Sequence, residues 1–211
     1  MRLIFTKPPD CGIRPAIFLD RDGVINQRIQ GGYVTERRQF KFLPGIKETL
    51  ASLSELRIPI IVISNQAAIG KGMLDASVLA EMTRRFVSLL ATAGARIDAV
   101  YYCPHTPEAE CPCRKPRPAL LKQAARDWRL DLTLSILVGD SVSDLEAARA
   151  VGCQAVFLAS RANQESITGP TTLLGSGVTS VSSVPEIGGV VHEFFRSDRK
   201  RTPKHCGSEA E

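Results

Sequence analysis

Long hydrophobic runs are missing from this sequence, and no apolar stretch approaches the ~18 consecutive residues that a membrane-spanning helix needs. The apolar stretch at the start of the chain is also too short for the core of a secretory signal. We therefore expect a cytoplasmic protein without membrane contact. In that reducing compartment, we do not expect its six cysteines to form disulfides.

Aromatic residues are few, at 6% of 211 residues, and they do not alternate with basic residues along any predicted strand. We therefore expect no nucleic-acid partner. Part of the net charge of +5 lies in the stretch 196–204, so we expect residues 196–211 to form a disordered basic tail. The remaining positive charge suits a small anionic substrate. The length favours a single domain over residues 1–195, and we expect a monomer.

Strand-like and helix-like segments alternate along the chain, which predicts a doubly wound α/β fold with a parallel sheet. The expected strands are residues 16–19, 60–63, 99–102, 134–138, 154–158 and 177–181. The expected helices are residues 44–57, 74–89, 118–128, 143–151 and 185–195. The polar segment 27–42 has room for a small flap over the sheet, but not for a separate cap domain.

The first predicted strand ends in Asp20-Arg21-Asp22-Gly23, which places two carboxylates one residue apart. At the carboxyl end of a strand, such a pair can share a divalent cation while performing different chemistry. The first carboxylate can attack phosphorus, and the second can protonate the leaving oxygen and later take a proton from water. A bare Asp-x-Asp pair fits an ordinary polar turn better, so this interpretation depends on the rest of the chain.

Three further polar groups follow in the order that phosphoryl transfer needs. Ser-Asn-Gln at 64–66 follows the second strand and offers hydrogen bonds to phosphoryl oxygens, and Arg-Lys-Pro at 114–116 supplies cations. Asp140 follows a later strand, with Asp144 four residues further on, and carboxylates of this kind can hold a metal. Because all of these groups lie at strand ends or in loops, one edge of the sheet is the expected active site.

The four ordered motifs resemble the haloacid dehalogenase (HAD) superfamily of phosphatases, over roughly residues 16–158. The resemblance implies a HAD-like Rossmannoid sheet and Mg²⁺-dependent hydrolysis through an aspartyl-phosphate on Asp20. It implies that Asp22 is the general acid and base, and that Ser64 and Lys115 bind the phosphoryl oxygens. Mg²⁺ would be held by Asp20, the backbone carbonyl of Asp22, and Asp140.

A cluster of three cysteines and one histidine lies within eleven residues, at Cys103, His105, Cys111 and Cys113. This spacing predicts a tetrahedral Cys₃His zinc site, and because four protein ligands leave no open position, the zinc should be structural. Residues 114 and 115 follow the cluster directly. Zinc would therefore fix the backbone that directs these two cations into the active site.

A zinc loop just before Cys-Arg-Lys-Pro is similar to the branch that contains D-glycero-D-manno-heptose 1,7-bisphosphate phosphatases and histidinol-phosphate phosphatases. Asn26 and the segments 31–34, 40–45 and 69–72 resemble the heptose branch, whereas the short zinc loop resembles the histidinol-phosphate branch at least as closely. A second phosphate would need cations at the rim of the site. The candidate substrate-binding residues are Asn26, Ser64, Asn65, Gln66, Lys71, Arg114 and Lys115, with Arg28 as a further rim cation.

Histidinol phosphate carries an ammonium group and would instead need a rim acid, for which Glu36, Glu108 and Glu110 are the only obvious candidates. We therefore favour the heptose bisphosphate, cleaved at the 7-position, and keep histidinol phosphate as the alternative. A polynucleotide 3′-phosphatase and a non-catalytic, zinc-stabilised binding module are less favoured.

The chain departs from the heptose branch at two positions, of which the second, Ser141, bears on the choice of substrate. Heptose-type relatives commonly have Thr where this chain has Ser64, and they often have Lys where it has Ser141.

Asp144 either holds a metal-bound water or simply lies in the first turn of a helix, where an acid is favoured.

Overall fold

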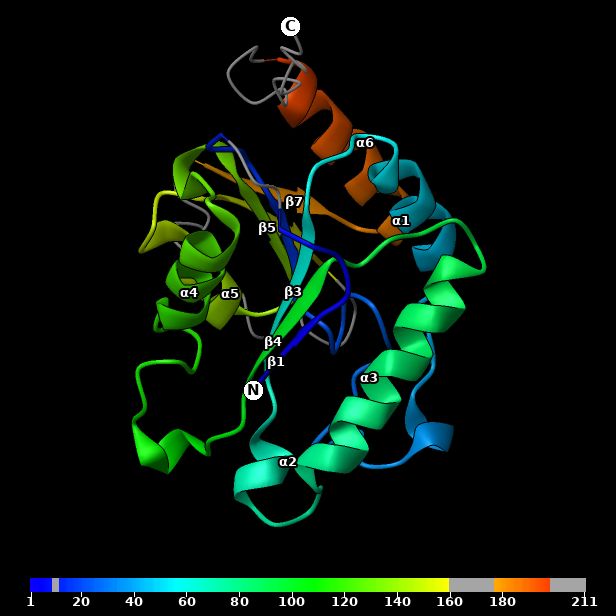
Figure 1. Cartoon of the computed structure of the whole chain (residues 1–211), viewed down its shortest axis with the longest axis vertical. Helices are drawn as coiled ribbons and strands as arrows, with labels where there is room; N and C mark the ends of the chain where they lie inside the picture. The colour runs from blue at the N-terminus through cyan, green and yellow to red at the C-terminus, as the bar shows by residue number, and fades with distance from the viewer. Residues whose placement is uncertain (9–11, 160–176, 198–211) are drawn as a thin grey trace, which may run out of the picture.

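The computed structural model describes residues 1–8, 12–159 and 177–197 (Figure 1). The predicted tail over 196–211 lies outside these ranges, except for Arg196 and Ser197. No helix in the described part of the chain combines the length and the apolar character needed to cross a membrane.

The centre of the fold is a seven-stranded sheet with the order β1-β4-β3-β2-β5-β6-β7. All neighbouring strands are parallel except for β1, which pairs with β4 in the antiparallel direction. The strands are β1 (Arg2–Ile4), β2 (Ile17–Leu19), β3 (Ile60–Asn65), β4 (Ala99–Cys103), β5 (Ile136–Gly139), β6 (Gln154–Leu158) and β7 (Val178–Val181). The central strands are apolar and buried along almost their whole length, as expected for a parallel sheet covered on both faces.

Helices cover both faces of the sheet and enclose two separate hydrophobic cores (Figure 1). One face is covered by α1 (Ile46–Ser54), α3 (Ala76–Ala91) and α6 (Val184–Arg196), which contribute Leu50, Phe86 and Val191 to the first core. The other face is covered by α4 (Ala119–Trp128) and α5 (Val142–Arg149), whose Trp128 and Leu145 belong to the second core. The shortest helix, α2 (Ala67–Gly70), follows β3 directly.

The doubly wound α/β class and the alternation of elements are confirmed, with two differences in the sheet and one added short helix, α2. The strand expected over residues 134–138 begins at Ile136, because Leu132–Leu134 forms a 3₁₀ turn that the Asp131 side chain caps through the Thr133 amide. The amino-terminal strand β1 was not predicted. Its three residues carry too weak a pattern, and it exists through its pairing with Val100 and its neighbours in β4.

The strand order places three carboxyl ends side by side. In the centre of the sheet β2 pairs with β3 on one side and with β5 on the other, and Leu19 is level with both Val62 and Val138. The chain therefore leaves β2, β3 and β5 at one edge, where the strand order reverses. Ligands of doubly wound proteins bind at such a switch point. The short segment between β2 and α1 lies over this edge and contains no separate domain.

Candidate active site

A buried lysine lies at the centre of this edge. The Lys115 Nζ donates to the Asp20 Oδ1 at 2.8 Å and to the Ile63 carbonyl at 2.7 Å, and it lies 2.5 Å from the Asp144 Oδ1. Its side chain is only 3% exposed. Burial alone would lower the pKa of Lys115, but Asp144 and Asp20 outweigh it and raise the pKa. The structure therefore places a permanent positive charge directly beside the carboxylate of Asp20.

Three buried carboxylates converge around this lysine. Oxygens of Asp20, Asp140 and Asp144 lie within 4.8 Å of one another. Burial raises the pKa of Asp140 to about 8, and the neighbouring charge of Asp20 adds to this effect. Burial also raises the pKa of Asp20. Burial is the main cause of these shifts, and the negative charges of the neighbouring carboxylates add to it. A buried, all-oxygen donor set of this kind fits a hard divalent cation such as Mg²⁺.

A glycine makes room for one of these carboxylates. Gly23 has a positive φ of 97°, and a Cβ on it would lie 1.8 Å from the Asp140 Oδ2. No other residue type fits there, because both the backbone conformation and the contact exclude a side chain. The turn after β2 is therefore closed tightly against the end of β5.

The carboxylate of Asp22 points away from this cluster and is held by three side chains. Arg21 donates to both of its oxygens at 2.8–3.2 Å, and Asn26 and Gln66 each donate at 2.8 Å. Burial would raise the pKa of Asp22, but the charge and hydrogen bonds of Arg21 outweigh it and lower the pKa. Asp22 is therefore oriented and ionised. Its backbone carbonyl accepts a hydrogen bond from Arg28 at 3.3 Å.

Two asparagines named from the sequence make hydrogen bonds to other groups of the site. Asn65 binds the backbone of Lys115 twice: its Oδ1 accepts from the amide at 3.0 Å, and its Nδ2 donates to the carbonyl at 3.1 Å. Asn26 is fully buried and donates to Asp22 and to the Gln27 carbonyl. Ser64 is buried beside Gln66, whose Nε2 donates to its hydroxyl at 3.2 Å.

A cleft of about 470 Å³ opens above these groups. Asp20 and Ser64 lie among the residues that line it, while its rim includes Arg28, Tyr33 and Arg114. Lys71 lies beside the rim, with its Nζ 5.2 Å from the centre of the Tyr33 ring. A larger hollow of about 770 Å³ between β1 and α3 contains none of these carboxylates, so we place the site in the smaller cleft.

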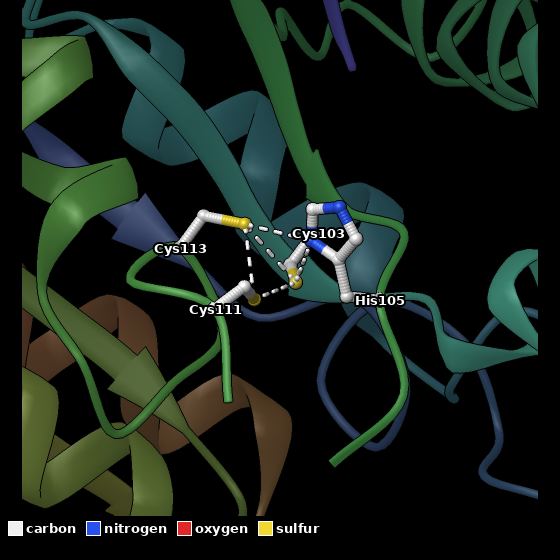
Figure 2. Close-up of side chains that lie close together, drawn as sticks. All are labelled: Cys103, His105, Cys111 and Cys113. Atoms are coloured by element: carbon white, nitrogen blue, oxygen red, sulfur yellow. Dashed lines mark hydrogen bonds between the residues drawn. The ribbon is translucent and has the colours of Figure 1, made fainter. Parts of the chain in front are cut away.

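The cysteine cluster lies next to the cleft, at the end of β4. The side chains of Cys103, His105, Cys111 and Cys113 point toward one another (Figure 2). The three sulfur atoms are 3.3–3.5 Å apart, and the His105 Nδ1 lies 3.3 Å from the Cys113 sulfur and 3.7 Å from that of Cys103. Sulfur ligands around one tetrahedral zinc would be about 3.8 Å apart, so a small outward movement suffices to admit the ion.

The thiols of the cluster differ in their acidity. Burial raises the pKa of Cys103 to about 12. Burial would also raise the pKa of Cys111, but hydrogen bonds from Cys113 and Cys103 lower it to about 6. One thiol is thus already disposed to be a thiolate, which is the form that binds a metal. The backbone of the loop is also tied to helix α2, since the Gly70 amide donates to the Pro104 carbonyl at 2.9 Å.

Comparison with known proteins gives the family. A HAD-hydrolase-like family model matches residues 112–184. A D-glycero-beta-D-manno-heptose-1,7-bisphosphate 7-phosphatase of Pseudomonas aeruginosa is 40% identical over 145 residues, which are 69% of this chain and 81% of the relative. The corresponding alpha enzyme of Mycobacterium tuberculosis is 43% identical over 145 residues, covering 68% and 76% of the two chains.

The chain belongs to the heptose-bisphosphate phosphatase family of HAD-like hydrolases. A solved member, the D,D-heptose 1,7-bisphosphate phosphatase from B. bronchiseptica complexed with magnesium and phosphate, superposes with a TM-score of 0.77 at 28% identity. The match covers 85% of this chain and 98% of that one. The resemblance to HAD phosphatases found in the sequence is therefore confirmed. The histidinol-phosphate alternative is not favoured by these relatives.

The structure adds contacts that the sequence does not reveal. Arg21 is 1% exposed, lies 5.8 Å from the centre of the Tyr102 ring and holds Asp22, although nothing in its position between two aspartates indicates a buried cation. Asp144 pairs with Lys115, and it also accepts hydrogen bonds from the Ser141 amide and hydroxyl as part of a helix cap. A Ser-x-x-Asp capping pattern at 141–144 was readable in the sequence, but the contact with the lysine was not.

Proposed function

We propose that this chain is a Mg²⁺-dependent phosphatase that removes the 7-phosphate of D-glycero-D-manno-heptose 1,7-bisphosphate. The observation that carries the proposal is the Asp20 carboxylate held against Lys115, with Asp140 and Asp144 beside it at the floor of an open cleft. Support for the substrate comes from the heptose bisphosphate phosphatases that are 36–43% identical to this chain. Relatives for both anomers occur among them.

In this proposal Asp20 is the nucleophile. Its carboxylate oxygen attacks phosphorus, the bond from phosphorus to the sugar oxygen breaks, and Asp22 gives a proton to that oxygen. Water then attacks the aspartyl-phosphate, Asp22 takes the proton from water, and inorganic phosphate and the free Asp20 carboxylate are formed. Lys115 reduces the repulsion between the carboxylate and the incoming phosphate, since its charge lies 2.8 Å from the Asp20 Oδ1.

The environment of Asp22 suits both of its tasks. The Arg21 pair keeps its pKa low, so Asp22 is ready to accept a proton from water. A substrate phosphate brings further negative charge into the same cleft and shifts that pKa upward, toward the form that donates. Asn26 and Gln66 hold the carboxylate in place during both steps.

Asp20, Asp140 and the Asp22 carbonyl would hold Mg²⁺, and Asp144 would hold it indirectly or act through Lys115. When bound, the ion supplies positive charge to the phosphoryl oxygens. The Ser64 hydroxyl and the Lys115 ammonium bind those oxygens from the protein side. We assign positioning roles to the two asparagines, because the side-chain amide of Asn65 is hydrogen-bonded to the backbone of Lys115 and that of Asn26 to the carboxylate of Asp22.

The second phosphate would remain at the rim of the cleft. The primary 7-phosphate can reach the floor because its carbon lies outside the sugar ring, which leaves the 1-phosphate near Arg114 and Lys71. Lys71 lies over the ring of Tyr33, and Arg114 and Tyr33 line the same cleft, so Tyr33 would contact the sugar. We propose that this pair of cations distinguishes a bisphosphate from a small monoester.

We further propose one structural zinc ion, bound by Cys103, His105, Cys111 and Cys113. The support is the convergence of four ligand atoms within 4.8 Å. The ion would fix the loop directly before Arg114 and Lys115. The working unit in this proposal is a monomeric domain over residues 1–195, acting in the cytoplasm on a small phosphorylated metabolite and without a nucleic-acid partner.

The test is a comparison of kcat/KM for the heptose bisphosphate and for histidinol phosphate, measured with Mg²⁺ and again after chelation. We expect a clear preference for the bisphosphate and loss of turnover with chelator. A preference for histidinol phosphate would contradict the substrate, and activity that survives chelation would contradict the role of the metal. Metal analysis of protein purified without chelator should show about one zinc per chain.

A further inference from the structure

Arg28 lies on the flap and reaches into the proposed magnesium site. One of its guanidinium nitrogens donates to the Asp140 Oδ1 at 2.6 Å and to the Asp22 carbonyl oxygen at 3.3 Å. These are two of the three oxygen donors assigned above to Mg²⁺. A single nitrogen therefore lies where a cation shared by those two oxygens would be placed.

The charges around the site favour replacement of this guanidinium by a divalent ion. Asp20, Asp140 and Asp144 bring three carboxylates that are 6% exposed or less, and Lys115 neutralises one of them. When all three carboxylates are ionised, as they would be as metal ligands, two negative charges remain. Arg28 offsets only one, with a side chain that is 47% exposed and costs little to move into water, whereas a divalent cation offsets both.

The backbone of the flap stays in place while this side chain moves. The Gln27 amide donates to the Lys41 carbonyl at 2.8 Å, and the Leu43 amide donates to the Ile25 carbonyl at 3.0 Å. These two hydrogen bonds join the two ends of the flap to each other at its base, immediately before Arg28. The guanidinium can thus leave Asp140 by side-chain rotation alone, and it remains in the wall of the same cleft.

We propose that Arg28 exchanges between two anionic partners. Its guanidinium occupies the metal-binding oxygens of Asp140 and Asp22 until Mg²⁺ takes them, and the released guanidinium then binds the non-reacting phosphate of the substrate. The first half of this inference is the exchange with Mg²⁺, and the second half is the binding of the phosphate. Only the second half rests on the proposed function. Arg28 thereby weakens Mg²⁺ binding in the free enzyme and strengthens the binding of a bisphosphate in the loaded one.

The first half is tested by calorimetric titration of chelator-treated, full-length protein with Mg²⁺ alone. Arg28→Gln should bind Mg²⁺ about fivefold more tightly than the wild type, which is the size of effect expected from a half-exposed ion pair. Arg28→Lys keeps the charge and should fall between the two. The matched control is Arg38→Gln, because Arg38 lies on the same flap, is 82% exposed and forms its ion pair with Glu36 rather than with a carboxylate of the cleft. Equal or weaker Mg²⁺ binding by Arg28→Gln would overturn the exchange.

Thermal unfolding gives a second measurement on the same proteins. Without Mg²⁺, Arg28→Gln should unfold at a lower temperature than the wild type, because it leaves the carboxylates uncompensated. Saturating Mg²⁺ should remove that difference. A deficit that persists at saturating Mg²⁺ would mean that Arg28 supports the fold rather than the metal site, and would overturn the proposal.

The second half is tested at saturating Mg²⁺ with the heptose bisphosphate and with p-nitrophenyl phosphate. Arg28→Gln should raise KM several-fold more for the bisphosphate than for the monoester. Equal changes for both substrates would overturn the second half. If the heptose bisphosphate is not a substrate at all, the proposed function fails, but the Mg²⁺ titration still decides the exchange.

Discussion

The floor of the cleft and the cysteine loop each gather four polar side chains, but the protein holds them in different ways. On the floor, Asp20, Lys115, Asp140 and Asp144 are at most 6% exposed. The three carboxylates lie at the ends of strands or at the start of a helix, and only Lys115 comes from the loop. In the loop, no residue from 104 to 114 is buried, and the only regular element is the 3₁₀ turn Pro107–Ala109.

This difference explains why the two regions need different supports. The sheet and its two cores already fix the floor, so its charges can be crowded for chemistry at a cost that the rest of the fold offsets. The loop has no core of its own, and a metal ion is the simplest link that can stiffen it. Because Lys115 belongs to both regions, we expect the rigidity of the loop to affect how this lysine is placed on the floor.

The strongest test of the comparison is Asp20→Asn. We expect phosphatase activity to fall by about 10³-fold or more, because the nucleophile is lost. The thermal midpoint should stay the same or rise, since one of three crowded carboxylates becomes neutral. Activity with p-nitrophenyl phosphate and thermal unfolding measure the two effects. Asp131→Asn is the control, because it removes the same charge from a helix cap outside the cleft. A variant that kept most of its activity would rule out the covalent step.

Cys111→Ser should lower the thermal stability more than Asp20→Asn does, and the activity less. Loss of one zinc ligand should release the metal, lower the thermal midpoint by several degrees and reduce activity about 10–100-fold through Arg114 and Lys115. Metal analysis, unfolding and kcat/KM together measure this change. Cys153→Ser removes a thiol outside the cluster and should leave the zinc content unaltered. Full activity in a zinc-free Cys111→Ser protein would show that the zinc loop is not needed to position the groups on the floor of the cleft.

Asn65→Ala tests the junction between the two regions. It removes both hydrogen bonds that Asn65 makes with the backbone of Lys115, each worth about 1 kcal/mol. We expect kcat/KM to fall about tenfold, with the zinc content unchanged, because the lysine is placed less accurately. Steady-state kinetics and metal analysis give the result. Unchanged kinetics would show that the zinc loop alone positions Lys115.

The smallest effect is expected at the exposed rim. Lys71→Ala should raise KM for the bisphosphate about three- to tenfold and change KM for p-nitrophenyl phosphate less, because the lost contact is remote from the reacting phosphate. Lys47→Ala is the matched control, since Lys47 lies over the Phe42 ring and away from the cleft. Equal effects on both substrates would exclude Lys71 from the binding of a second phosphate.

The sequence predicted most of the fold and the composition of the site. The strand over 154–158 agrees with β6 at both ends, and helix α4 begins within one residue of its expected start. Such elements follow from local apolar patterns and from proline and glycine at their ends. Most motif residues could be named in the same way, because they lie at or just after the end of a strand, or just after a loop cysteine.

Some short elements could not be predicted, although the three-residue strand β2 was. Strand β1 has three residues, and it forms because β4 offers a free edge far along the chain. The early part of the expected strand 134–138 is a 3₁₀ turn, which the Asp131 side chain caps. The Ser135 hydroxyl, which follows the turn, donates to the Asp131 carbonyl and accepts from the distant Ala16 amide. A local pattern contains no information about such partners.

By itself, the sequence determined which chemical groups are present and at which strand ends they lie, because both follow from neighbouring residues. Only the tertiary structure decided how those groups pair. Lys115 meets Asp20 across 95 positions and Arg28 meets Asp140 across 112, while Arg21 turns inward toward its neighbour Asp22 and Tyr102. The physical reason is that charge pairing depends on distance and burial in the folded molecule, and these are set by the sheet order rather than by separation along the chain.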